Sequence, residues 1–230
     1  MKIRSPFHLL WILLFLAPVA FAQGGPGNGG GGGGGQGLLD RYLASLPLQV
    51  VDAVERADLE HMRQEEKLAR DVYLALFQAH GTPAFANIAD SEQSHMDLVA
   101  AMLVRYGIAD PLPSDQPGVY RDQAFQDLYV MLVSFGRLSP LHAEVVGALV
   151  EDLDIVDLQH AIARTDNRDL ATVWQNLARG SRNHLRSFDG LLGLRGFHWF
   201  GVFLTQAEVD AIVTAPRETV PVDENGVPLR

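Results

Sequence analysis

The sequence predicts an all-α protein, an antiparallel four-helix bundle with short extra helices. Between residues 38 and 196 apolar residues recur three and four positions apart, which is the spacing of one helix face. Proline, glycine and Asp/Asn clusters interrupt this pattern, and strand-like alternation is almost absent. Four long periodic segments with short breaks between them make a bundle the default architecture.

The first half of this region predicts two long helices and one short helix. The first long helix is expected over residues 52–80, because Gly81 and a proline follow it. The second is expected over residues 84–106 and stops at a glycine. After a proline-rich loop, a shorter helix is expected over residues 122–134.

The second half predicts two more long helices. One begins after Ser139-Pro140, a suitable cap and first-turn pair, and is expected to end near residue 153. The segment 154–157 then resembles the N-cap of a new short helix that reaches residue 164. The last long helix opens at Asp166-Asn167 and ends near residue 193 or 196.

The ends of the chain differ in character from the helical region 38–196. Residues 1–22 combine a basic start, a short apolar stretch and an Ala-x-Ala end, which predicts a secretory signal peptide and a periplasmic or secreted protein. A membrane anchor is the alternative, but the apolar stretch is shorter than the roughly 20 residues that a spanning helix needs. Residues 23–37 predict a glycine-rich flexible linker. Residues 197–230 predict a tail that packs on the bundle or is partly disordered.

Composition excludes several classes of function. The formal net charge of −10 becomes −12 when Lys2 and Arg4 leave with the signal peptide, which disfavours nucleic acid and anionic lipid as partners. Because the chain has no cysteine, its own side chains cannot hold an iron–sulfur cluster or a thiolate zinc site.

The strongest chemical signal is the pair Glu92 and His95, which lie one turn apart on the apolar face of the second long helix. A buried carboxylate needs a compensating partner, and a divalent metal ion is one such partner. A hydrogen bond between the two side chains in the core is the structural alternative. Helical bundles that bind two metal ions supply a Glu-x-x-His pair in this way.

The other long helices also direct polar groups inward. The first carries Glu65 and Glu66 at the edge of its apolar arc, and spacing alone does not choose between them. The third carries Glu151, and the fourth carries His184 among apolar residues. One shared site explains four such helices better than four independent coincidences. The remaining histidines and several acids, with His61, Asp71 and Asp157 among them, are expected to be ordinary surface, loop or cap residues.

The order of these groups resembles the ferritin-like di-iron proteins, rubrerythrin among them. The segments 65–73, 88–95 and 180–186 more specifically resemble an uncharacterised ferritin-like family of bacteria and archaea, over about residues 55–195. The resemblance implies a ferritin-like fold and selects Glu66 over its neighbour. It implies a ligand set for two metal ions, with iron expected and manganese or zinc as alternatives: Glu66, Glu92, His95, Glu151 and His184.

One position departs from the family pattern. A complete site would carry a glutamate three residues before His184, and Ser181 stands there instead, beside Gly180. This turn is expected to be open, and a small oxidant is expected to reach the metals through it. Asp154, one turn after Glu151, is an alternative ligand, although its position equally suits a helix N-cap.

Three functions follow from these expectations. The first is a di-iron or related oxidoreductase that reacts with oxygen or peroxide and takes electrons from an external donor. The second is a non-catalytic module for metal binding, storage or sensing. The third is a helical interaction protein without a metal. The expected partners are metal ions and small oxidants, with a homodimer left open and no embedding in a membrane.

Overall fold

The structure is a computed structural model that describes residues 33–230, so the expected signal peptide and the first part of the expected linker lie outside the described residues. Within that range the chain is helical and contains no strand beyond an isolated bridge between Val222 and Pro228, which confirms the all-α prediction. The helices are α2 (Gly33–Ser45), α3 (Ala53–His80), α4 (Pro83–Arg105), α5 (Gln123–Gly136), α6 (Pro140–Arg164), α7 (Arg168–Gly193) and α8 (Gln206–Thr214).

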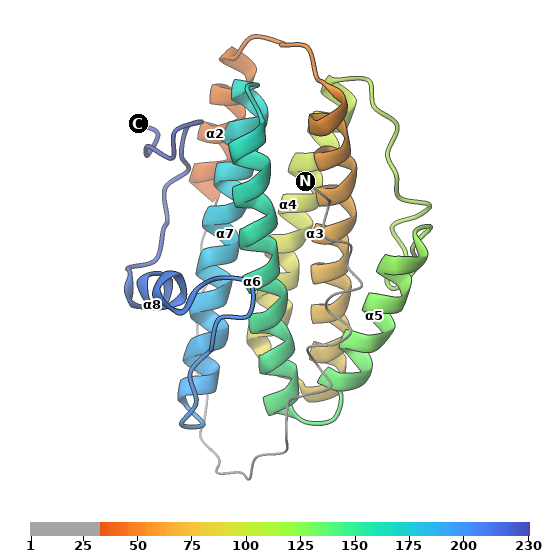
Figure 1. The fold of residues 1–230 in the computed structure, drawn as a ribbon, viewed down its shortest axis with the longest axis vertical. Coiled ribbons are helices and arrows are strands. Elements are labelled where there is room, and N and C mark those ends of the chain that lie inside the picture. The colour runs from red at the N-terminus through yellow and green to blue at the C-terminus, as the bar shows by residue number, and fades with distance from the viewer. Residues whose placement is uncertain (1–32) are drawn as a thin grey trace.

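The four long helices α3, α4, α6 and α7 lie side by side along the long axis of the molecule (Figure 1). Helix α3 packs against α4 and α6, and α7 packs against the same two helices, so the four enclose one interior. The short helix α5 covers α3 and α6 from outside, and α8 lies on the opposite flank against α7. This interior is where the predicted ligands have to meet.

Local signals set several helix ends where the sequence predicts them. Asp52 caps α3 through a capping box with Glu55, and Gly81 ends the helix in the left-handed conformation, with a φ of 68° that favours glycine. Asp122 and Ser139 accept backbone hydrogen bonds at the starts of α5 and α6. These caps satisfy backbone groups that the first and last turns leave free, which explains why the boundaries are readable from sequence.

Two expected boundaries are wrong. Helix α6 does not break near residue 153 but continues to Arg164, because Ile155, Leu158 and Ala161 keep its buried face apolar beyond that point. Tertiary packing thereby outweighs the modest helix propensity of the aspartates at 154 and 157. At the other end, the last residues of the expected linker, 33–37, belong to helix α2.

Helix α2 is held by its apolar side chains rather than by its glycines. Leu39, Leu43 and Leu46 are buried in the same apolar cluster as Leu59 and Trp174. Burial of leucine side chains supplies the free energy that the glycine-rich start of the helix lacks.

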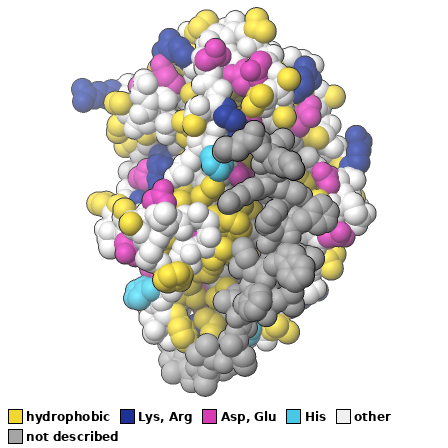
Figure 2. Space-filling view, viewed as in Figure 1, with side chains coloured by type: hydrophobic (Ala, Val, Ile, Leu, Met, Phe, Trp, Pro, Cys, Tyr) yellow, Lys and Arg dark blue, Asp and Glu magenta, His cyan; other side chains and the backbone are white. Residues whose placement is uncertain are grey.

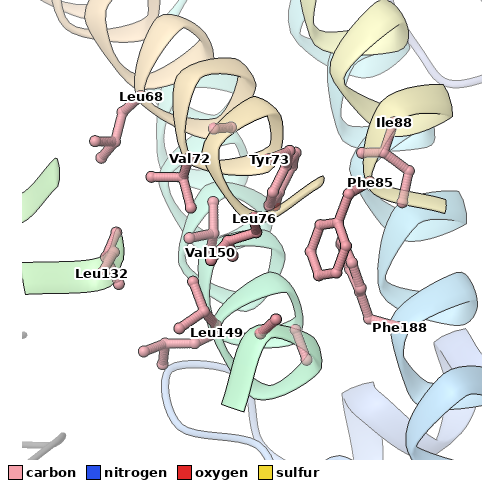
Figure 3. Packing of buried hydrophobic residues seen from close by; sticks show 14 of the residues in the cluster. Leu68, Val72, Tyr73, Leu76, Phe85, Ile88, Leu132, Leu149, Val150 and Phe188 are labelled. Carbon is pink, nitrogen blue, oxygen red and sulfur yellow. The ribbon is translucent and has the colours of Figure 1, made fainter. Parts of the chain in front are cut away.

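The interior consists of two apolar clusters with a polar layer between them. One cluster, shown in Figure 3, brings Tyr73, Phe85 and Phe188 together from α3, α4 and α7. The other lies toward the opposite end of the long helices and contains Leu59 of α3 and Leu177 of α7. Between the two, each long helix places charged side chains in the interior.

The segment after α7 packs on the bundle, as one of the two expectations for the tail proposes. Asp152 of α6 is fully buried, and its carboxylate accepts hydrogen bonds from Trp199 Nε1 at 3.0 Å, Val202 N at 2.7 Å and Leu204 N at 2.7 Å. A Thr205–Glu208 capping box then starts α8. The Asp152 carboxylate therefore holds three points of the chain between α7 and α8.

The surface of the described residues carries charges of both signs. On the face shown in Figure 2, acidic and basic side chains are interspersed, and no extended basic surface gathers among the described residues there. None of the described helices has the length and apolar character needed to cross a bilayer.

The contacts of Asp152 predict the effect of removing its charge. Asp152→Asn places an amide group against backbone N–H donors, and we expect the free energy of unfolding to fall by about 1–3 kcal/mol. Denaturant unfolding measures the loss, and amide hydrogen exchange over residues 199–214 should accelerate. The exposed Asp210→Asn in α8 is the control and should change neither quantity; equal effects of the two substitutions would refute the anchoring role.

Candidate metal centre

The structure brings all five predicted ligands into the polar layer between the apolar clusters. Glu66 comes from α3, Glu92 and His95 from α4, Glu151 from α6 and His184 from α7. The carboxylates are 1–2% exposed and His184 is 6% exposed, so the groups are held away from water. Four helices that are separate in sequence thus contribute to one interior site.

The ligand atoms form two groups that share one carboxylate. His95 Nδ1 lies 2.8 Å from Glu92 Oε2 and 3.1 Å from Glu66 Oε2. His184 Nδ1 lies 2.8 Å from Glu92 Oε1 and 3.4 Å from Glu151 Oε2. In each group the three ligand atoms lie within 4.8 Å of one another. Glu92 therefore turns one oxygen toward each group, as a carboxylate that bridges two ions does.

Several of these buried atoms lack a hydrogen-bond partner among the described residues. They are Glu66 Oε1, Glu92 Oε1 and His184 Nδ1, and the neighbouring Asp154 Oδ1 belongs with them. Buried polar atoms without partners are rare in folded proteins, and each one calls for an explanation. Converging carboxylate oxygens and imidazole nitrogens are the donor set that iron, manganese and zinc accept.

Neighbouring side chains orient the ligands. Tyr73 is fully buried, and its hydroxyl donates to Glu151 Oε1 at 2.5 Å. Ser91 Oγ lies 2.9 Å from Nε2 of His184, which leaves the Nδ1 atom of that ring to face the two glutamates. Such outer contacts set the direction of a ligand and tune its affinity for a metal.

The turn expected to be open at Ser181 is filled. Ser181 is fully buried and donates from Oγ to Asp154 Oδ2 at 2.5 Å, so an aspartate of α6 approaches the position where the family pattern has a glutamate of α7. The space beside Gly180 is occupied by the ring of His95, because a Cβ at that glycine would lie 2.4 Å from Nε2 of the ring. Asp154 is therefore not the N-cap that the sequence equally suggests.

Burial and mutual repulsion separate the acidities of the groups. Burial raises the pKa of Glu66 to about 8, and although the charge of His95 opposes this shift, the nearby Glu92 adds to it. Glu92 behaves differently: burial opposes its ionisation, but the two histidines hold its pKa well below the usual range. In the other direction, burial disfavours the charged form of His95, yet Glu66 and Glu92 raise its pKa to about 9. An ionised central carboxylate flanked by protonated imidazoles is the result.

Several other ionisable residues lie in environments that the sequence did not predict. Asp71, expected in solvent, is fully buried, pairs with Lys67 and accepts a hydrogen bond from the hydroxyl of Tyr120 at 2.9 Å. His61 and Asp157, also expected to be ordinary surface residues, form a third group of ligand-type atoms with Glu65. Only the i, i+4 spacing of His61 and Glu65 could have suggested this group beforehand.

Fold and site together define the class: an all-α helical protein whose interior holds a candidate carboxylate–histidine metal centre. Residues 55–216 match the family described as "Uncharacterized protein domain (DUF2202)", and the chain belongs to this family. The match includes α3–α8 and all five candidate ligands. The expected likeness to an uncharacterised family is thereby confirmed.

A relative and a solved structure extend this result. The chain is 44% identical over 177 residues to "Uncharacterized protein MJ0754" of Methanocaldococcus jannaschii, which covers 77% of this chain and 96% of that protein. The "Crystal structure of hypothetical protein MJ0754 from Methanococcus jannaschii DSM 2661" is similar with a TM-score of 0.74 and 44% identity, over 76% of this chain and 99% of that chain. The long helices are therefore similar to those of an experimentally determined fold.

The contact between Gly180 and His95 predicts opposite effects for two glycine substitutions in α7. Gly190→Ala meets no atom within 4 Å, so it should stabilise the helix by about 0.5–1 kcal/mol. Gly180→Ala forces the His95 ring to move and should instead destabilise the protein by about 1–3 kcal/mol. Denaturant unfolding of the two variants measures the contrast, and equal stabilisation by both would show that the close approach carries no cost.

The raised pKa of Glu66 predicts a pH-dependent effect of Glu66→Gln in metal-free protein. The folded state holds the proton more tightly than the unfolded chain, so the wild-type free energy of unfolding declines as pH rises from the ordinary value of 4.5 toward about 8. The amide cannot ionise. With a chelator present, we expect the stability of the variant relative to wild type to improve by about 1–3 kcal/mol between pH 5 and pH 8. Exposed Glu60→Gln on the same helix is the control, and a flat difference for Glu66→Gln would contradict the prediction.

Proposed function

We propose that the protein is a ferritin-like di-metal carboxylate protein that binds iron and reacts with oxygen or peroxide. The observation that carries this proposal is the shared carboxylate: Glu92 faces His95 with one oxygen and His184 with the other. Glu66 would complete the first group and Glu151 the second. The ferritin-like assignment, and iron in place of manganese or zinc, are part of the proposal.

The donor set supports a pair of metal ions over a purely structural polar core. In a purely structural core nearly every buried polar atom has a hydrogen-bond partner. Here Glu92 Oε1 and His184 Nδ1 face each other at 2.8 Å as an ion pair, without hydrogen-bond geometry. A bound cation would give both atoms a partner and would neutralise carboxylates that burial otherwise penalises. Iron bound here would supply the redox chemistry, while the protein orients the ligands and excludes water.

The protein's own residues would control protons at the site. Tyr73 donates a hydrogen bond to Glu151 and so holds that carboxylate in one orientation. Burial raises the pKa of Glu151 to about 7, against the opposing charge of His184 and with the help of Glu92. Because the site binds protons where it would bind metal, metal binding should release protons and strengthen as pH rises.

A non-catalytic role in metal storage or sensing is the second candidate, and the closed geometry of the site favours it. Ser181 is buried and Gly180 is covered by His95, so this side of the centre is not open to a small oxidant. Both candidates require the same ligands and differ only in turnover. In either case the pattern of residues 1–22 leads us to propose an exported protein.

Metal content and oxidation rate test the proposal together. We expect the buried centre of the purified protein to bind about two iron ions per chain, and Glu92→Ala/His95→Ala to lose both of these ions, since Glu92 contributes to each group. Circular dichroism establishes that the double variant is folded. Exposed His160→Ala is the matched control for loss of a histidine and should keep the two ions.

The same samples separate the two candidates. Fe(II) oxidation by oxygen or peroxide faster than in buffer, and dependent on Glu92 and His95, supports the enzyme. Bound metal without faster oxidation supports storage or sensing. If neither protein binds metal and both are equally stable, the polar layer is structural and the proposal fails.

A further inference from the structure

The third group of ligand-type atoms lies at the edge of the bundle, between α3 and α6. His61 Nε2 is 3.3 Å from Glu65 Oε2 and 3.7 Å from Asp157 Oδ2. One ligand atom from each of the three residues lies within 4.8 Å of the other two. This group contains none of the five residues of the buried centre.

The three side chains of the group differ in solvent exposure, as a site that an ion reaches from solvent would require. The side chains of His61 and Asp157 are 40% and 32% exposed, whereas Glu65 as a residue is only 4% exposed. The group therefore has an outer side formed by a histidine and an aspartate, and an inner side formed by a glutamate.

The inner carboxylate is only partly compensated by the protein. Glu65 Oε2 has no hydrogen-bond partner among the described residues, and it points into the group, toward His61. Within the described chain, neither Glu65 nor Asp157 forms a salt bridge with a lysine or arginine. The imidazole of His61 can carry only one positive charge beside these two carboxylates, and a divalent cation would compensate them more fully.

The chemistry of the donors indicates the kind of cation. One imidazole nitrogen and two carboxylate oxygens suit iron, manganese, zinc or cobalt, whereas magnesium and calcium prefer oxygen ligands alone. The ring of His61 also packs against Phe125 of α5, with ring centroids 5.5 Å apart, which restrains the orientation of the imidazole.

Two residues connect this group to the buried centre. Glu65 is followed directly by the candidate ligand Glu66 in α3. Asp154 lies one helical turn before Asp157 in α6, is 6% exposed, and has an oxygen, Oδ1, without a hydrogen-bond partner. Its other oxygen, Oδ2, accepts a hydrogen bond from Ser181 of α7, so Asp154 points into the interior of the bundle.

We propose that His61, Glu65 and Asp157 bind a divalent transition-metal ion at the edge of the bundle, and that ions pass from there to the buried centre. The first part depends only on the three residues. The second part rests on the proposed function and uses Asp154 as the carboxylate between the two sites.

Cobalt(II) binding tests the first part without relying on the buried centre. In the Glu92→Ala/His95→Ala background we expect about one cobalt ion per chain by equilibrium dialysis, with an absorption spectrum of a nitrogen- and oxygen-ligated ion. Adding His61→Ala should abolish this binding, and adding Asp157→Asn should weaken it at least about tenfold. Adding His198→Ala, an exposed histidine that contacts none of the three residues, should leave it unchanged. Unfolding curves establish that each variant is folded.

The outcomes distinguish this inference from the proposed function. Cobalt that remains after His61→Ala and Asp157→Asn, or no cobalt in the double-variant background, overturns the edge site even if wild-type protein binds two ions inside. Conversely, an ion that depends on His61, with no others bound in wild type, supports the edge site while the proposed function fails.

Loading kinetics test the second part. In otherwise wild-type protein, His61→Ala should slow cobalt uptake by the buried centre by about tenfold or more in stopped-flow experiments, while the final occupancy of that centre stays the same. Slower uptake with unchanged occupancy supports the transfer of ions from edge to centre. An unchanged uptake rate refutes the transfer and leaves the edge site as a separate binding site.

Discussion

Ionisable groups held in the middle of an apolar interior are the constraint on which the rest of this structure depends. Taking an ion from water into a protein interior costs several kcal/mol unless a partner compensates it. Here much of that cost falls on one layer, where Glu92 lies between His95 and His184. The two apolar clusters on either side of the layer stabilise the fold through buried apolar surface, and this stabilisation offsets the cost of the buried charges. A protein under no functional demand would gain stability by replacing this layer with apolar residues.

Close approach of the helices follows from this constraint. Gly180 leaves room for the His95 ring, and Gly147 leaves room for the ring of Phe188, since a Cβ at either glycine would come within 2.4 Å of the ring. Both glycines therefore matter because they have no side chain, which leaves space for the neighbouring ring. The candidate ligands are held in place between neighbouring helices, and Tyr73 adds a directional hydrogen bond to Glu151. Such rigidity is what a site for ions with fixed coordination preferences requires.

Much of this arrangement could be predicted from the sequence because it depends on neighbours along one helix. The all-α class, the caps at Asp52 and Ser139, and the common face of Glu92 and His95 all follow from the helical period and from local hydrogen bonding. The helical periodicity also predicted that Glu151 faces the interior. Because the helical repeat fixes which side chains share a face, these predictions needed no knowledge of which helices lie together.

Contacts between helices decided the rest. Spacing left Glu65 and Glu66 equivalent, but the packed helices direct one to the edge of the bundle and the other to the buried centre. The sequence suggested that Asp154 could be either a helix N-cap or a ligand. In the structure Ser181 of α7 donates a hydrogen bond to Asp154, and apolar packing keeps α6 helical through that position. The sequence by itself determined which faces are apolar and which polar groups they carry. Only the tertiary structure decided which of those groups meet, because their partners lie on helices far apart in the chain.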